Sequence, residues 1–168
     1  MILADIVMWF LIIVGLLLAF NSYWLASAAL FPAMVGRTHA AYTRPIRVLL
    51  VGAVLAVPLI FLGAAIASAP NPVVKLLGLA IISIPILVGL VGSAGLSQRI
   101  GQGMGSSLDE RQPWRRVLRG GVVLSLLFLF PFLGWFVVLP ATLLSGFGAA
   151  ALALRGGAIP EQLPLTEP

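Results

Sequence analysis

The stretch Gly120–Leu154, GGVVLSLLFLFPFLGWFVVLPATLLSGFGAAALAL, decides the fold, because about 35 consecutive residues carry no charge. A single straight α-helix of this length would measure roughly 50 Å, whereas the hydrocarbon core of a bilayer is about 30 Å thick. The stretch is therefore too long for one ordinary membrane span.

A helix break is predicted near the middle of this stretch, at Pro131, Gly134 and Trp135. Proline removes a backbone donor and disfavours helix at the preceding residue, and glycine permits a tight turn. Tryptophan prefers the interface between membrane and water. We expect a hairpin of two apolar arms with its break at or near the far interface. One overlong, kinked helix is the alternative.

The composition indicates a protein that folds in lipid. Apolar residues make up 61% of the chain, charged residues 9%, and the mean hydropathy is +1.13. Soluble domains are about half apolar and a quarter charged, and a chain of this size has no core large enough for the surplus. These values predict an all-α integral membrane protein with four to five transmembrane helices, the last apolar stretch forming the Pro/Gly-broken hairpin.

A single transmembrane domain is predicted over residues 1–155, with spans at about residues 2–27, 48–69, 73–96, 116–130 and 135–154. The N-terminal run lacks the positive region of a signal peptide, so we expect it to stay attached as the first span. The turn at residues 69–72 is short, which makes the second and third spans adjacent and antiparallel. Residues 156–168 are expected to form a disordered tail.

Small and polar residues within the spans predict helix contacts. Gly89, Gly92 and Gly95 recur every three residues and allow a partner helix to approach closely. Asn21 is expected to hydrogen-bond a neighbouring helix. The apolar spacing of residues 96–104 predicts a short amphipathic segment in the interface, which the glycines there would weaken.

Two basic segments, residues 37–47 and 99–119, are predicted loops that face the cytoplasm, with the N-terminus outside. Within the second loop, residues 107–110 have the spacing of a capping box. Basic side chains near an anionic membrane surface contribute about 1 kcal/mol each. The predicted ligands of anionic lipid headgroups are Arg37, Arg44, Arg47, Arg115, Arg116 and Arg119.

No residue pattern in the chain indicates catalysis, a cofactor or a metal, and we expect a protein that is not an enzyme. There is no cysteine, and the single histidine, His39, is interpreted as a solvated loop residue. Hydroxyl groups in the spans have no acid or histidine beside them in sequence. Of these, Ser125, Thr142 and Ser145 are expected to bond their own backbone. The four tryptophans are interpreted as interface anchors: Trp9, Trp24, Trp114 and Trp135.

The second half of the chain resembles the small membrane domain associated with bacterial bactofilin-type, polymer-forming cytoskeletal proteins. The similarity is carried by GLVGSAGLSQRIGQGMG at residues 89–105, by the Pro131–Trp135 break and by GFGAA at residues 146–150. This chain lacks the β-helical polymer domain of that family. The resemblance implies a bacterial inner-membrane protein with a scaffolding or envelope-associated role, and it implies no catalytic residue.

The predicted function is therefore that of a non-enzymatic multipass protein, acting as an accessory subunit, scaffold or anchor in a membrane complex. The alternative is a small transporter or channel component that uses its proline-broken helices, since interrupted helices often mark binding sites. The expected partners are anionic lipids and other membrane proteins or further copies of the chain. The basic residues cluster at segment ends, a sign of membrane topology rather than of nucleic-acid binding.

Overall fold

The structure, a computed structural model, describes residues 2–105, 112 and 114–155, and these residues form helices and turns without a strand. The elements in chain order are α1 (Ile2–Leu30), α2 (Pro32–Ala41), α3 (Pro45–Ala67), α4 (Pro72–Gly103), α5 (Trp114–Phe128), α6 (Pro131–Leu133), the π-helix η1 (Gly134–Val138) and α7 (Leu139–Arg155). In the described part of the chain, four helices are long and apolar enough to span a membrane: α1, α3, α4 and η1 joined to α7. The predicted all-α, multipass membrane class is confirmed.

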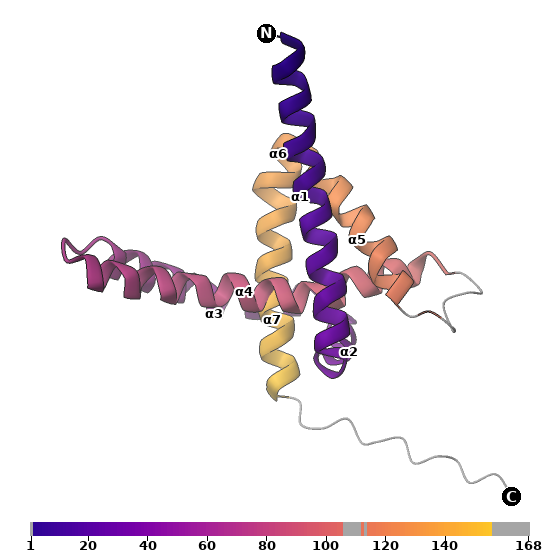
Figure 1. The fold of residues 1–168 in the computed structure, drawn as a ribbon. Helices are drawn as coiled ribbons and strands as arrows, with labels where there is room; N and C mark the ends of the chain where they lie inside the picture. The colour runs from indigo at the N-terminus through magenta and orange to yellow at the C-terminus, as the bar shows by residue number, and fades with distance from the viewer. Residues whose placement is uncertain (1, 106–111, 113, 156–168) are drawn as a thin grey trace, which may run out of the picture.

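Two sets of helices cross near the middle of the molecule (Figure 1). The hairpin of α3 and α4 passes across α7, and its closed end extends well beyond the crossing. The glycine-mediated backbone approaches between the hairpin and α7 lie at residues 48–52 of α3 and 89–93 of α4. Helices lying side by side would stay in contact over many turns, so this short contact agrees with the steep crossing in the figure.

Glycines make the crossing possible, because backbone lies directly against backbone there. A Cβ atom at Gly52, Gly92 or Gly146 would come within 3.0 Å of a carbonyl oxygen on the facing helix. Gly95 makes a similar approach to Thr38 and the backbone of α2. The predicted use of the glycines at residues 89, 92 and 95 as helix-packing positions is confirmed.

The turn between α3 and α4 is stabilised by a side-chain cap and a proline at the start of α4. The Asn71 side chain accepts a hydrogen bond from the Val73 N–H at 2.9 Å, and Pro72 occupies the first turn of α4. Proline is favourable there because that N–H has no partner in the helix. A Cβ on Gly63 would lie 2.9 Å from the Gly78 carbonyl oxygen, so the two helices also touch near their closed end. The predicted antiparallel neighbours are confirmed.

The first basic segment is largely helical, so the predicted loop over residues 37–47 is wrong. Phe31 interrupts the chain after α1, and Pro32 then opens α2, which continues to Ala41. Proline is tolerated at the start of α2, because the N–H that it removes has no partner within the helix. The non-helical part of this segment is the turn at residues 42–44.

The predicted interface helix over residues 96–104 is also wrong, because α4 runs without interruption to Gly103. Ser97 is fully buried, and a Cβ on Gly101 would come within 3.0 Å of the Arg116 carbonyl oxygen. The glycines of this segment therefore serve as the surface on which α5 packs, which offsets their low helix propensity.

The last apolar stretch breaks where the sequence predicts and the chain doubles back (Figure 1). After α5, the N–H of Phe130 bonds the Leu127 carbonyl at 3.3 Å, Pro131 opens α6, and the Gly134 N–H bonds the Phe130 carbonyl at 2.7 Å. A Cβ at Gly134 would lie only 2.7 Å from the Phe128 carbonyl oxygen. The hairpin is confirmed and the single kinked helix is excluded. Since α5 has 15 residues, it measures about 22 Å, shorter than a bilayer core.

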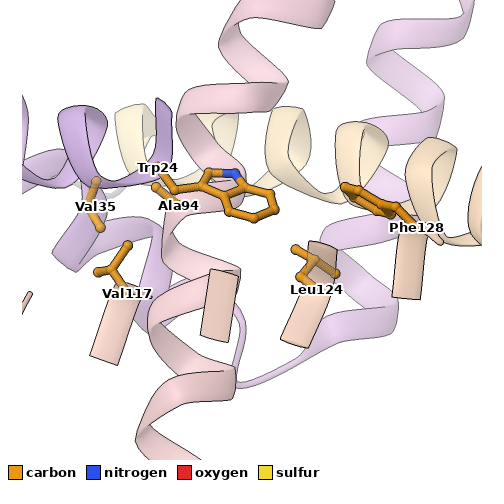
Figure 2. Packing of buried hydrophobic residues seen from close by; sticks show 6 residues of the cluster. All are labelled: Trp24, Val35, Ala94, Val117, Leu124 and Phe128. Atoms are coloured by element: carbon orange, nitrogen blue, oxygen red, sulfur yellow. The ribbon is translucent and has the colours of Figure 1, made fainter. Parts of the chain in front are cut away.

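A buried apolar cluster joins α1, α2, α4 and α5 around Trp24 (Figure 2). The indole lies between Val35 and Val117 on one side and Leu124 and Phe128 on the other. Trp24 is 1% exposed, and its ring nitrogen donates a hydrogen bond to the Ser93 hydroxyl at 2.8 Å. The interpretation of Trp24 as an interface anchor is therefore wrong, whereas Trp9, Trp114 and Trp135 are exposed.

Candidate functional site

The structure brings the two basic segments together at one end of the molecule, here called the basic end. Close backbone contacts join α2 to α4 at Gly95 and α4 to α5 at Gly101. The starts of α3 and the last turns of α7 also meet, because Gly148 packs on the Val48 carbonyl. The arginines that these helices carry at or near their ends are Arg37, Arg44, Arg47, Arg99, Arg115, Arg116, Arg119 and Arg155.

The basic end has a large excess of positive charge. Asp5, near the far end of α1, is the one acidic residue among the residues that the structure describes. Arg44 and Arg47 are exposed, whereas Arg37, Arg115, Arg116 and Arg119 are half-buried. The guanidinium of Arg115 also lies 5.6 Å from the ring centroid of Trp114, within reach of a cation–π contact. The arginines predicted as headgroup ligands thus lie on helices that contact one another.

His39 lies inside α2 and is half-buried, so its interpretation as a solvated loop residue is wrong. Burial lowers the pKa of His39, and the positive charges of Arg99 and Arg116 lower it further. Its Nδ1 atom is buried without a hydrogen-bond partner. No group of three potential metal ligands occurs among the described residues. Its burial and the neighbouring arginines therefore favour the neutral imidazole over the protonated form.

Tyr42 follows α2 and ties the basic end to α7. Its hydroxyl donates to the Ser145 hydroxyl at 3.2 Å, and the ring is buried beside Val48 and Ala149. Burial raises the pKa of the Tyr42 phenol. The neutral phenol therefore links the turn after α2 to α7 through this hydrogen bond.

A further hydrogen bond between helices joins α1 to α5. Asn21 donates to the Ser125 hydroxyl at 2.8 Å, which confirms the predicted bond to a neighbouring helix. Thr142 donates to the Val138 carbonyl at the end of η1 at 2.7 Å, and Ser145 donates to the Thr142 carbonyl at 3.2 Å, so both bond backbone one turn earlier, as predicted. Ser125 instead takes part in the contact with α1. These hydroxyls are occupied in joining helices or in bonding their own backbone.

The sequence contains a signal for the buried face of α1. Asn21, Trp24 and Ser27 recur every three residues, which places them along one face of a helix. The structure buries Trp24 and Ser27 and half-buries Asn21 on the side that meets α4 and α5. A periodic row of hydrogen-bonding side chains in an apolar helix is typical of a helix contact.

Two apolar hollows lie where α1 meets the end of α5 and the start of α7. The larger has a volume of about 500 Å³ and is bounded by Trp9, Leu16, Phe128 and Trp135, among others. A smaller hollow of about 110 Å³ shares Phe20 and Phe128 with it and reaches Trp24. No charged residue lines either hollow, so a bound molecule would find apolar contacts there and no group for acid–base catalysis.

A third hollow, of about 340 Å³, differs because an arginine lines it. It lies between the end of α1, the start of α2 and the end of α7, with Arg37 at its edge. The predicted capping box at residues 107–110 and the predicted tail at residues 156–168 lie outside the described residues.

Comparison with known proteins gives no assignment: no protein-family model, curated protein or solved structure matches this chain.

Proposed function

We propose that the chain is a non-enzymatic accessory or scaffold subunit of a complex in the bacterial inner membrane. The observation that carries this proposal is the outer part of the α3–α4 hairpin, residues 57–88, here called the arm. Within the arm only Gly63, Gly78 and Pro85 are buried, and Gly63 and Gly78 belong to the contact between its own two helices. Ile86, at its inner end, lines the small hollow beside Phe20 and Phe128, and the closed end of the arm extends away from the other described helices (Figure 1).

The steep crossing supports a partner for this arm. Transmembrane helices tilt by about 20° on average from the bilayer normal. The α3–α4 hairpin and α7 therefore cannot both stand near the normal, and contacts outside the chain would fix the tilt of each. Large apolar side chains line the arm, and Phe61 is 72% exposed. Partner helices could pack on such a surface through van der Waals contact.

The resemblance of the second half to the bactofilin-associated membrane domain supports an envelope-associated role. The grouping of arginines at one end supports an orientation in which the basic end faces the cytoplasm and anionic headgroups. Because the chain contains no cysteine, single cysteines can test the orientation. A cysteine at Ser68, in the α3–α4 turn, should react with an impermeant reagent from the exterior, and one at Thr43 should react only after permeabilisation.

Crosslinking in native membranes tests the partner. A photo-reactive residue in place of Phe61 should yield a defined protein adduct, and the same residue at Trp114, which is exposed at the basic end, provides the control. We expect the solubilised chain to run as an oligomer or to copurify with a second membrane protein. A single unaccompanied copy, with Phe61 attached to lipid alone, would remove the proposal.

One observation favours the alternative of a transporter component. The π-helix η1 borders the 500 Å³ hollow, and π-helices are frequent at functional sites. A transport path for ions usually needs ionisable groups within the membrane, and the walls of this hollow carry none. Flux of ions or small solutes into liposomes containing the purified chain would establish this alternative in place of the scaffold.

A further inference from the structure

The hollow beside Arg37, here called the groove, combines an apolar lining with one charged side chain, as a binding site for an amphipathic molecule does. Its volume is about 340 Å³, and segments far apart in the sequence form it. Its apolar walls come from the break between α1 and α2 and from the end of α7: Leu30, Phe31, Pro32, Ala33, Met34, Ala153 and Leu154. Arg37 is the one charged residue in its lining.

Along the chain, the lining of the groove changes from apolar to charged, as a bilayer does from its hydrocarbon core to its headgroups. Leu30 ends α1, a helix that can span a bilayer, and Arg37 follows in α2. From Pro32 to Arg37 the helix rises by about 8 Å, over which the lining changes from apolar to cationic. A phospholipid changes in the same direction, from acyl chain to phosphate.

Arg37 is suited to an anionic group. Its side chain is half-buried, and the part of the chain that the structure describes offers it no acidic partner, since Asp5 lies near the opposite end of α1. The planar guanidinium binds phosphate oxygens in a bidentate way and is less strongly hydrated than an ammonium. The surrounding arginines of the basic end add a field that favours a net negative headgroup over a zwitterionic one.

We infer that this groove binds one anionic phospholipid, with its phosphate on Arg37 and an acyl chain along Leu30, Phe31 and Leu154. The inference goes beyond the proposed scaffold role, because it requires no protein partner. The test below distinguishes the lipid from two other occupants: a second copy of the chain, or its own residues 156–168, which include Glu161 and Glu167.

Lipid retention by the full-length protein tests the inference. The purified chain is delipidated, incubated with phosphatidylglycerol or phosphatidylcholine, and weighed intact by native mass spectrometry to count bound lipids. Arg37→Gln is compared with Arg99→Gln, which removes an exposed arginine of the basic end that does not line the groove. Ala33→Trp, which fills the groove, is compared with Ala40→Trp, an exposed site on the same helix outside the groove.

We expect one tightly retained phosphatidylglycerol per chain and weaker retention of phosphatidylcholine. Arg37→Gln should weaken retention about fivefold, the equivalent of about 1 kcal/mol for one arginine at an anionic surface. Ala33→Trp should abolish retention, whereas Arg99→Gln and Ala40→Trp should bind lipid as the unmodified chain does. Millimolar inorganic phosphate should not displace the lipid, because it has no acyl chain.

Three results would overturn the inference. Equal losses in Arg37→Gln and Arg99→Gln would mean diffuse attraction by the basic end without a site. Full retention in Ala33→Trp would place the lipid elsewhere. A several-fold gain in lipid binding when residues 156–168 are deleted, or when dimers are dissociated, would assign the groove to the chain itself. None of these results depends on whether the arm has a protein partner.

Discussion

Alanine in place of Gly146 should separate the two crossing helices, and the structure gives the size of the effect. A Cβ at this position would lie 2.8 Å from the Ser93 nitrogen and 2.9 Å from the Gly89 carbonyl carbon, and closer still to the Gly89 oxygen. The first distance is 0.6 Å short of the 3.4 Å at which ordinary contact begins. All three atoms belong to backbone, so α4 must move away from α7.

The expected cost follows from two opposing effects. Overpacking a well-packed contact costs about 1–3 kcal/mol, and a clash with rigid backbone belongs at the upper end of that range. Alanine recovers about 0.5–1 kcal/mol of helix propensity relative to glycine. Gly146→Ala should therefore lower the free energy of unfolding by about 2 kcal/mol.

Gly36→Ala is the matched control, because a Cβ on Gly36 would meet no atom within 4 Å. The same chemical change should there stabilise α2 by about 0.5–1 kcal/mol. Unfolding in mixed micelles of a mild detergent and sodium dodecyl sulfate, followed by far-ultraviolet circular dichroism, measures both variants. Adding Gly89→Ala to Gly146→Ala should cost less than the sum of the single changes, since both act on one crossing. A Gly146→Ala variant as stable as Gly36→Ala would refute the backbone contact.

Three further predictions concern the polar and aromatic side chains. Trp24→Phe removes the donor to Ser93 and part of the ring volume, and should destabilise the fold by about 1–3 kcal/mol in the same unfolding assay. Tyr42→Phe removes one bond between helices and should cost about 0.5–1 kcal/mol, with no further cost when Ser145→Ala is added. The pKa of His39 is lower in the folded state, so the unfolded chain binds more protons than the folded one as the pH falls below about 6.5, and thermal stability should fall there. His39→Gln should abolish that component of the pH dependence. An identical loss of thermal stability at low pH in the variant would contradict this assignment to His39.

The class of the protein and its two hairpins could be predicted because each depends on local chemistry. The turn at residues 69–72 and the break at Pro131 and Gly134 are set by which backbone groups those residues can bond. The glycines at residues 89, 92 and 95 likewise predicted close helix contacts.

The partners of those contacts could not be predicted, because they join distant segments. No local pattern pairs Gly92 with Gly146, or Gly101 with the start of α5. The error over Trp24 has the same origin. Tryptophan is favoured both at membrane interfaces and in buried clusters, and the choice depends on whether a hydroxyl such as that of Ser93 lies opposite.

The kind of contact that each helix makes determines how firmly it is held in the fold. Apolar burial does not drive helices together in lipid, so close packing and hydrogen bonds must hold them. The helices α3, α4, α5 and α7 meet through glycines at which backbone touches backbone.

The first helix lacks such a contact. Gly15 of α1 has no atom within 4 Å of its Cβ position, and Gly121 of α5 instead receives the side chains of Asn21 and Trp24. Two hydrogen bonds and the aromatic cluster around Trp24 therefore hold the C-terminal half of α1, and no residue from 3 to 19 is buried. The bonds to Ser93 and Ser125 are each worth about 0.6–2 kcal/mol in a membrane. Because α1 has no backbone-to-backbone glycine contact besides these bonds, it is the helix that a partner would most easily displace.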